Sequence, residues 1–299
     1  RECGHVMECE HCDISLTYHE REQILKCHYC NYTTKVPDVC PDCGSKYIKH
    51  FGVGTQQVEE VMNEIFPEAK VVRMDRDTTT RKGAYRKILS SFKQGEIDIL
   101  VGTQMVAKGH DYPNVTLVGV ITADTALNLP DFRASERTFQ LLAQVAGRTG
   151  RGDKGGEVVI QTYTPQHYSI QYAKGHDYQG FYNHEIVFRE KSGYPPIGHL
   201  INLIVTDAEE EKTIQTAQKL GEIINSNLDK LTDEGVELRG PVPASLAKLQ
   251  GEYRWQLLLK GRDLSQLREV SQKSLTELES TNNLKSVKIN IDVDPLRVL

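Results

Sequence analysis

The sequence predicts an α/β protein in three parts: a cysteine-rich zinc ribbon, a doubly wound parallel sheet with helices on both faces, and a small C-terminal α+β domain. All seven cysteines lie between residues 3 and 43, which places the metal chemistry at one end of the chain. Between residues 45 and 190, short strands that are apolar on both faces alternate with amphipathic helices, as in helix-covered parallel sheets. Beyond residue 192 the predicted order becomes β-α-β-β-α-β, the split arrangement of ferredoxin-like domains.

Length and charge set the outer limits of the interpretation. A chain of 299 residues is expected to form two or three domains. The net charge of −5 gives no overall attraction to nucleic acid, so DNA binding must come from local patches. No apolar run reaches the ~18 residues of a membrane-spanning helix, and the first residues do not resemble a signal segment. We therefore expect a cytoplasmic protein without a membrane partner.

The elements of the central part follow from apolar periodicity. Each predicted helix has apolar residues at helical spacing, and each predicted strand is a short run rich in apolar residues. Pro67 is expected to stop the first helix. The predicted helices are 56–66, 80–94 and 133–146, and the predicted strands are 70–74, 97–101, 115–122 and 157–163.

A turn-forming stretch at Ser192-Gly193-Tyr194-Pro195-Pro196 marks the expected boundary with the last domain. The resulting domain prediction is 1–48 for the zinc-binding region, 49–192 for the parallel-sheet unit and 193–299 for the C-terminal domain. Its predicted strands are 200–206, 236–239, 254–259 and 287–293, and its predicted helices are 209–231 and 264–279.

The cysteine spacing is typical of zinc knuckles. Three C-x-x-C pairs are present, and Cys3 stands apart from them; the pairs are Cys9 with Cys12, Cys27 with Cys30, and Cys40 with Cys43. A knuckle turns two thiolates toward one ion, and two knuckles complete a tetrahedral site. The 14-residue interval between Cys12 and Cys27 suits a zinc ribbon. Cys3, Cys40 and Cys43 would then supply a second site.

Seven cysteines are one short of two four-thiolate sites. A cysteine immediately before Arg1 would complete the second site, which leads us to expect that the chain begins inside a longer protein. Alternatively, a histidine (His5, His11 or His28) takes the vacant position. A disulfide framework is a further alternative, although the absence of cysteine elsewhere and of a signal segment favours a reducing compartment.

The densest chemical information lies between residues 97 and 152. Gly102-Thr103-Gln104 follows a buried strand at its carboxyl end, where open α/β sheets bind ligands, and 108–111 continues that loop. A long helix then ends in QVAGRTGRG, which carries Gln144, Arg148 and Arg151. Paired arginines are commonly solvated surface residues. Together with the glutamine and interleaved glycines, however, they suit charge stabilisation at a transferring phosphoryl group.

Two phosphoryl-transfer elements are missing from the 299 residues. No G-x-x-x-x-G-K-[ST] phosphate loop occurs, and no predicted strand ends in an acidic pair suited to Mg²⁺. The chain therefore supplies candidate arginine fingers without the loop that would hold a nucleotide.

These motifs resemble a known family. GTQMVAKGHDYPNVTLVGV and QVAGRTGRG are similar to motifs V and VI of superfamily 2 helicases. The cysteine spacing, ADTALNLPDFRASERTFQ, SGYPP, GPVPA and the terminal DVDP extend the likeness to the primosomal replication-restart DNA helicases, over essentially the whole chain. The resemblance implies a bacterial enzyme that recognises stalled replication forks, unwinds DNA 3′ to 5′ using ATP and helps reload the replicative helicase.

In that family the central part is a RecA-like second helicase lobe (motifs IV–VI), and the roles transfer to matching positions. Motif VI gives Gln144, Arg148 and Arg151 a catalytic role facing the ATP γ-phosphate. The positions implied for ATP binding are Gly109, Asp111, Gly147 and Gly150, and those implied for DNA-backbone contact are Gly102, Thr103, Gln104 and Lys108. The inner zinc site would use Cys9, Cys12, Cys27 and Cys30, and the outer site Cys3, Cys40, Cys43 and the missing residue.

The family's first helicase lobe, with its phosphate loop and Mg²⁺ motif, is not represented here. ATP and Mg²⁺ would need that lobe, so the 299-residue chain should not hydrolyse ATP alone. The resemblance further implies forked DNA with a single-strand/duplex junction, primosome proteins and single-strand-binding protein as partners.

Two alternative functions remain at this point. One is a zinc-ribbon nucleic-acid or protein adaptor with a non-catalytic RecA-like lobe, which would have no reason to retain Arg148 and Arg151. Another is an RNA or recombination helicase, which fits motif VI but not the cysteine spacing. Separately, the basic residues of 73–87 either extend a DNA track or form a solvated helix face, and Trp255 is expected to pack inside the last domain rather than stack on a base.

Overall fold

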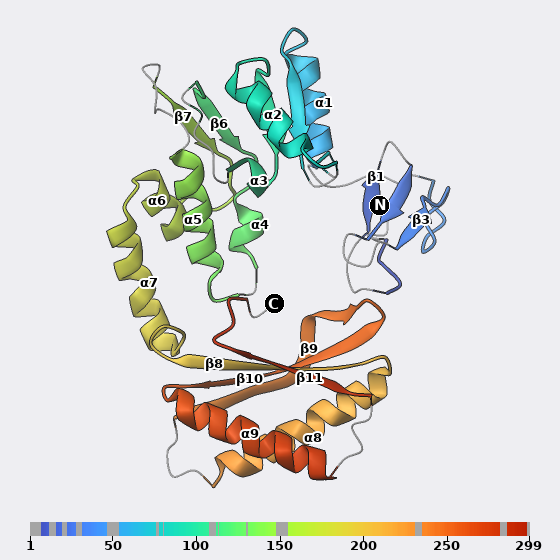
Figure 1. The fold of residues 1–299 in the computed structure, drawn as a ribbon, viewed down its shortest axis with the longest axis vertical. Helices are drawn as coiled ribbons and strands as arrows, with labels where there is room; N and C mark the ends of the chain where they lie inside the picture. Colours follow the sequence, from blue (N-terminus) through green and yellow to red (C-terminus); the bar gives the residue numbers. More distant parts are fainter. Residues whose placement is uncertain are drawn as a thin grey trace. The chain divides into compact units, whose positions relative to one another are not determined.

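The computed structural model describes residues 7–11, 16–19, 23–27, 32–46, 54–75, 78–79, 81–107, 112, 114–129, 131–147, 155–230, 235–281 and 286–297. The chain forms two compact units, one made of residues 1–50 and 186–299 and the other of residues 51–185. Within the described part of the chain, no helix is long and apolar enough to span a bilayer. Figure 1 shows the elements in chain order.

The cysteine-rich region contains a small antiparallel sheet in the order β1-β2-β3. Its strands are β1 (Thr17–His19), β2 (Ile24–Lys26) and β3 (Thr33–Lys35). Three strands of three residues bury very little apolar surface, so this module is the kind of small domain that depends on bound metal for its stability.

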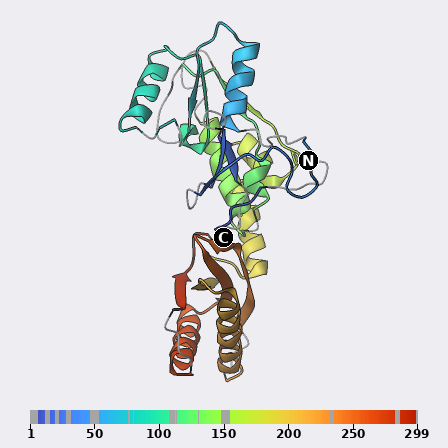
Figure 2. The ribbon, with the colours of Figure 1, turned by 90° about the vertical axis from the view of Figure 1, so that its right-hand side faces the viewer.

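The C-terminal residues form a four-stranded antiparallel sheet in the order β11-β8-β10-β9. Both long helices cover the same face of the sheet and lie side by side (Figures 1 and 2). The element order is β-α-β-β-α-β, as predicted. The elements are β8 (His199–Asp207), α8 (Glu210–Leu228), β9 (Val236–Leu249), β10 (Glu252–Gly261), α9 (Leu264–Thr281) and β11 (Lys288–Val293).

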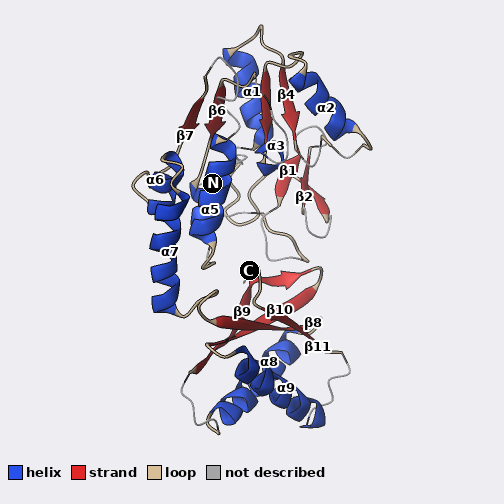
Figure 3. Cartoon of the chain, turned by 60° about the vertical axis from the view of Figure 1, so that its left-hand side comes forward, coloured by secondary structure: helices blue, strands red, loops and turns tan. Residues whose placement is uncertain are grey.

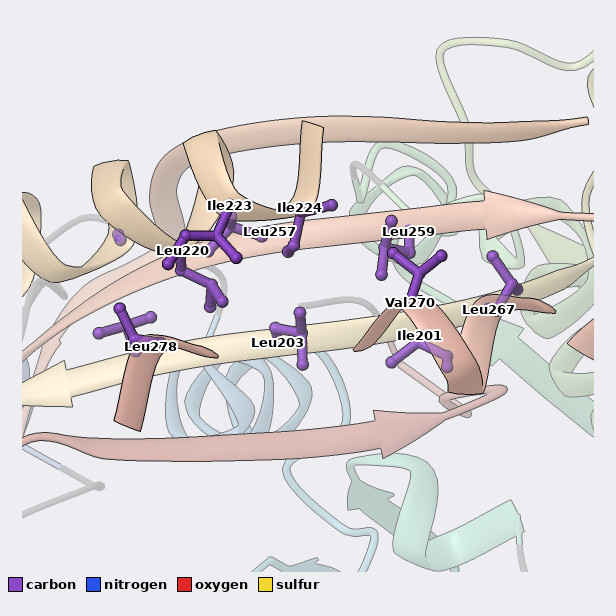
Figure 4. Close-up of a cluster of buried hydrophobic side chains, with 12 residues drawn as sticks. Ile201, Leu203, Leu220, Ile223, Ile224, Leu257, Leu259, Leu267, Val270 and Leu278 are labelled. Atoms are coloured by element: carbon purple, nitrogen blue, oxygen red, sulfur yellow. The ribbon is translucent and has the colours of Figure 1, made fainter. Parts of the chain in front are cut away.

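The core of this domain lies between the sheet and its two helices. Ile201 and Leu203 of β8 meet Leu257 and Leu259 of β10, and side chains of α8 and α9 close over them (Figure 4). Trp255 is partly buried and packs against this core, as predicted.

Strand β9 is longer than its predicted 236–239. The segment Gly240-Pro241-Val242-Pro243 indicates a turn in the sequence, yet the strand continues to Leu249 with irregular register against β10. Proline is tolerated here because β9 is an edge strand, whose outward N–H groups need no partner.

The second unit, residues 51–185, combines short parallel strands with helices. Strands β4 and β5 pair in parallel, as do β6 and β7. Helices α1 and α2 pack against the first pair (Figure 3). The elements are α1 (Thr55–Ile65), β4 (Val71–Met74), α2 (Ala84–Lys93), β5 (Ile99–Gly102), α3 (Gln104–Ala107), β6 (Leu117–Val120), α4 (Asp124–Leu127), α5 (Ala134–Ala146), β7 (Glu157–Ile160) and α6 (Tyr168–Lys174).

The predicted doubly wound sheet differs from the observed one. Parallel pairing is present, but the described strands of this unit form two separate pairs rather than one sheet buried on both faces. In the pair β6 and β7, Leu117 and Val159 are more than half exposed, whereas Val120 and Ile160 face a core with α5 and α6. The pair is therefore covered on one face only.

Helix α2 begins at Ala84 rather than near residue 80, because Gly83 before it adopts a left-handed conformation with φ of +87°. Helices α6 and α7 (Tyr178–Ser192) were not predicted. Helix α7 runs across the division between the two units, since residues up to 185 belong to one and residues from 186 to the other.

Candidate functional site

The carboxyl end of β5 is built around a glycine that has no room for a side chain. A Cβ on Gly102 would overlap Val106 Cγ2 and the backbone carbonyl oxygen of Met74 on the paired strand β4. The absence of a side chain at Gly102 allows β4 and β5 to approach closely. This close packing fixes where the chain turns out of β5 into the next residues. Thr103 and Gln104 follow at once, both exposed, and open helix α3. Two of the candidate DNA-contacting residues, Thr103 and Gln104, are thus exposed at the carboxyl end of β5, the end at which open α/β sheets commonly bind ligands.

Helix α3 connects this edge to the second candidate motif. It packs against both β5 and helix α5. Met105 and Val106 of α3 join a cluster around buried Met74, Leu89 and Tyr112. Helix α3, which follows Gly102-Thr103-Gln104, and helix α5, which carries Gln144, are therefore neighbours within one unit.

Helix α5 presents Gln144 to solvent while burying its opposite face, which includes Phe139, Leu142 and Val145. The helix ends at Ala146, and the Gly147 N–H donates to the Ala143 carbonyl at 3.0 Å. The remaining candidate site residues lie outside the described residues: Lys108, Gly109, Asp111, Arg148, Gly150 and Arg151.

Asp75, at the carboxyl end of β4, is a buried carboxylate that sequence reasoning did not single out. Its Oδ2 accepts a hydrogen bond from Thr55 Oγ1 at 2.7 Å, which ties the start of α1 to the end of β4. Its Oδ1 accepts from the backbone N–H of Thr78 at 3.0 Å. Burial disfavours the charged form, but these hydrogen bonds and the neighbouring guanidinium of Arg73 outweigh it and lower the pKa of Asp75.

Arg73 was predicted as one member of a possible basic track. Its side chain is only 10% exposed, and its Nε lies 3.3 Å from Asp75 Oδ2 and 3.5 Å from Glu59 Oε2. This arginine is therefore committed to an internal ion pair and does not extend a DNA-binding surface. Other basic residues of this stretch remain exposed, namely Arg81, Lys82, Arg86 and Lys87, whereas Arg76 lies outside the described residues.

A second unpredicted carboxylate connects the carboxyl ends of β6 and β7. Asp124 opens α4 and accepts hydrogen bonds from the hydroxyls of Thr162 and Thr164 at 3.0 and 3.2 Å. It also accepts the backbone N–H of Tyr163. Burial opposes ionisation, but the hydrogen bonds from Tyr163 and Thr162 hold the pKa of Asp124 below its usual value. Asp124 thus fixes the β6 and β7 ends relative to each other.

The predicted zinc ligands fall partly within the described residues. Cys9 and Cys27 are buried in one cluster with the partly buried Leu16 and Tyr32, and they come from different knuckles. The backbone N–H of His11 donates to Cys9 Sγ at 3.4 Å, as expected for an amide that stabilises a thiolate. Cys12, Cys30 and Cys3 lie outside the described residues.

The third knuckle has the tight turn that metal binding needs. Gly44, with φ of +70°, donates its N–H to the Cys40 carbonyl at 2.9 Å, and Cys40 N–H donates to Ser45. Cys40 is buried and Cys43 is exposed. No group of three or more metal-ligating side chains occurs among the described residues. The thiols of Cys9 and Cys27 nevertheless lie in one buried cluster. Sulfur donors brought together in this way fit zinc, which prefers thiolates in closed tetrahedral sites.

Comparison with known families assigns each part of the chain. Residues 9–35 match the family described as the PriA DNA helicase Cys-rich region, residues 47–153 match the helicase conserved C-terminal domain, and residues 190–296 match the primosomal protein N C-terminal domain. Two of these three matches, at residues 9–35 and 190–296, are to domains described for PriA, and over its whole length the chain is similar to the C-terminal portion of PriA proteins. The three matches follow one another in the order of the zinc module, the helicase lobe and the α+β domain.

Curated relatives carry the name replication restart protein PriA. The Bacillus subtilis protein is 48% identical over all of this chain, which spans 37% of that protein. The Synechocystis protein is 46% identical over all of this chain and 35% of its own length. The Haemophilus influenzae protein is 40% identical over 98% of this chain and 40% of its own length. The chain therefore spans little more than a third of these PriA relatives.

Among solved structures, a de novo designed protein, Foldit4, covers 32% of this chain with a TM-score of 0.25 at 13% identity. A likeness at that level carries no argument about the fold.

Proposed function

We propose that this chain is the C-terminal part of an ATP-dependent 3′–5′ DNA helicase that recognises stalled replication forks and restarts replication in the cytoplasm. It supplies the second, RecA-like helicase lobe of a two-lobe motor, a module holding two Zn²⁺ ions and a ferredoxin-like C-terminal domain. The proposed boundaries are 1–48, 49–192 and 193–299. Support for the ferredoxin-like assignment comes from the β-α-β-β-α-β order and the strand order β11-β8-β10-β9.

The observation that carries the motor proposal is the packing of helix α3, which follows Gly102-Thr103-Gln104, against helix α5, which carries Gln144. Gly102 has no space for a Cβ, and α3 packs against α5, which exposes Gln144. A rigid connection of this kind suits a motor, because the nucleotide state at motif VI must reach the DNA at motif V. In the proposal, Thr103, Gln104 and Lys108 contact the DNA backbone. Such contacts tolerate any sequence, as translocation requires.

Nucleotide binding is proposed to need a partner lobe from outside the 299 residues, which would supply the phosphate loop and Mg²⁺ ligands. Arg148 and Arg151 would meet the charge that develops on the γ-phosphate, and Gln144 would act with them as the third catalytic residue of motif VI. Gly109, Asp111, Gly147 and Gly150 would line the nucleotide. Forked DNA, single-strand-binding protein and primosome proteins are the proposed partners.

The zinc proposal assigns Cys9, Cys12, Cys27 and Cys30 to the inner ion. Cys3, Cys40 and Cys43 would hold the outer ion with one further ligand. When bound, zinc would act as a structural crosslink, because four thiolates leave no open position for a substrate.

The decisive experiment uses the full-length protein. Replacing Arg148 or Arg151 with Ala should lower DNA-stimulated ATP hydrolysis by roughly 10³-fold, since an arginine finger contributes that order of rate enhancement. Binding to forked DNA, measured in parallel, should be preserved. Arg262→Ala, which alters an exposed arginine of the C-terminal domain, is the matched control. Turnover of either finger variant within tenfold of wild type would show that the role is misassigned.

A further inference from the structure

The tip of the β9–β10 hairpin is a compact structure distant in sequence from the cysteines. Strand β9 ends at Leu249 and β10 begins at Glu252, leaving a two-residue turn of Gln250 and Gly251. Both turn residues have positive φ, 53° and 83°, as in the tight type I′ hairpin turn. This turn directs the Gly251 N–H away from the hairpin's own ladder.

The hairpin tip contacts the first knuckle of the zinc module within the same compact unit. The Gly251 N–H donates to the His11 carbonyl at 2.8 Å, and Lys248 Nζ donates to the Glu10 carbonyl at 3.0 Å. These two carbonyls belong to the residues between Cys9 and Cys12. This loop would present two ligands to the inner ion. Its backbone carbonyls accept hydrogen bonds from the C-terminal domain, which therefore holds the loop in place.

Leu249 adds an apolar contact to these hydrogen bonds. Its side chain packs against the buried pair Cys9 and Cys27, alongside Leu16 and Tyr32. Leu16 and Tyr32 belong to the zinc module itself, whereas Leu249 comes from more than 200 positions along the chain. The apolar shell around a metal site controls how water and competing ligands reach it. Part of that shell is thus supplied from outside the metal-binding module.

We propose that the β9–β10 hairpin tip is a cover for the inner zinc site, and that Leu249 is a positioning residue that retains the ion without binding it. The inference rests on the zinc assignment of the proposed function. Loss of the cover lets water and chelators reach the sulfurs of Cys9 and Cys27. Conversely, loss of zinc frees the first knuckle and releases the hairpin tip. An ordered hairpin tip thus favours bound zinc, and bound zinc favours an ordered hairpin tip.

The test is zinc release from the zinc-loaded chain to a chromogenic chelator. Cys43→Ser is used as the background, so that the measured zinc comes from the inner site. Adding Leu249→Ala should speed release by about tenfold, the scale of outer-shell changes at metal sites. Leu238→Ala is the matched control, because it shortens the same side chain on the same strand, where Leu238 packs against the core of the C-terminal domain. It should lower the melting temperature and leave the release rate unchanged.

Amide hydrogen exchange gives a second readout that does not require a variant. Removing zinc should accelerate exchange of the Gly251 amide, while the amides of Leu203 and Leu257 at the centre of the sheet keep their protection. Three results would each overturn the proposed cover. The first is zinc release from Leu249→Ala no faster than from its Cys43→Ser background, and the second is an equal acceleration of release by Leu238→Ala. The third is an exchange rate of the Gly251 amide that does not change when zinc is removed. A chain that binds no zinc at the inner site would overturn the zinc assignment together with it.

Discussion

The close approach of β4 and β5 at Gly102 can be tested by adding a single methyl group. In Gly102→Ala the new Cβ meets Val106 Cγ2 and the Met74 carbonyl oxygen well inside van der Waals contact. A valine methyl can turn aside, but a strand carbonyl cannot, so the two strands must separate. Overpacking of this kind costs about 2 kcal/mol, which lowers the melting temperature of a unit this size by roughly 6 °C.

The functional cost should exceed the loss of stability. Thr103 and Gln104 follow Gly102 directly, and displacing positioned groups by about 1 Å can cost 10²-fold in rate. We therefore expect DNA-stimulated ATP hydrolysis by the full-length variant to fall by about that factor at a temperature where the protein remains folded. Melting curves and ATPase assays on the same preparation separate the two effects.

Gly119→Ala provides the matched control for this experiment. Gly119 lies in β6 of the same unit, and a Cβ there has open space around it. The control should melt at or slightly above the wild-type temperature, because alanine restricts the unfolded chain more than glycine does. If Gly102→Ala melted together with Gly119→Ala, the inferred contact between the strands would be refuted.

Two further changes test the carboxylate network and the zinc module. Because hydrogen bonds lower the pKa of Asp124, its contribution to stability is present above the unfolded pKa of about 3.9 and is lost as the pH falls through the folded value. Asp124→Asn should therefore have a lower melting temperature than wild type at pH 7, and this difference should shrink below about pH 4. A difference in melting temperature that stayed constant across that range would contradict the ionised network. Glu64→Gln, which alters an exposed carboxylate, serves as the control. Cys27→Ser removes a fully buried thiol, so metal analysis should find less zinc and circular dichroism should show the module unfolded; unchanged zinc content would exclude Cys27 as a ligand.

The sequence predicts the regular elements well where apolar residues form the buried face. Helix α7 shows where this approach stops. Its buried positions include Phe181, Glu185 and Arg189, spaced four apart, and two of the three are charged. Glu185 accepts a hydrogen bond from the Tyr168 hydroxyl, and Arg189 donates to the Pro195 carbonyl. Periodicity of apolar residues cannot reveal a helix whose buried face includes charged side chains that hydrogen-bond to residues outside the helix.

The candidate site is divided in a similar way. Gly102 could be identified from the sequence, because a glycine at the end of an apolar strand indicates that a ligand or another backbone segment approaches closely there. Asp75 and Asp124 could not, because each depends on hydrogen-bond partners that are distant in sequence, namely Thr55 for Asp75 and Thr162 and Thr164 for Asp124. The contact of Leu249 with the cysteines spans most of the chain and leaves no local signal. The proposed arginine fingers at 148 and 151 stay predictions, since they lie outside the described residues.

The two outer strands of the C-terminal sheet bear on how the protein behaves at high concentration. Exposed strand edges recruit strands of neighbouring molecules and so promote aggregation. Edge strand β9 carries Pro241 and Pro243, which have no N–H to offer an incoming strand, and the opposite edge β11 presents charged Lys288 and Asp292. Both borders of the sheet are thus poor templates for further pairing. Concentrated solutions of this domain should resist fibre formation, even though its sheet is not closed into a barrel.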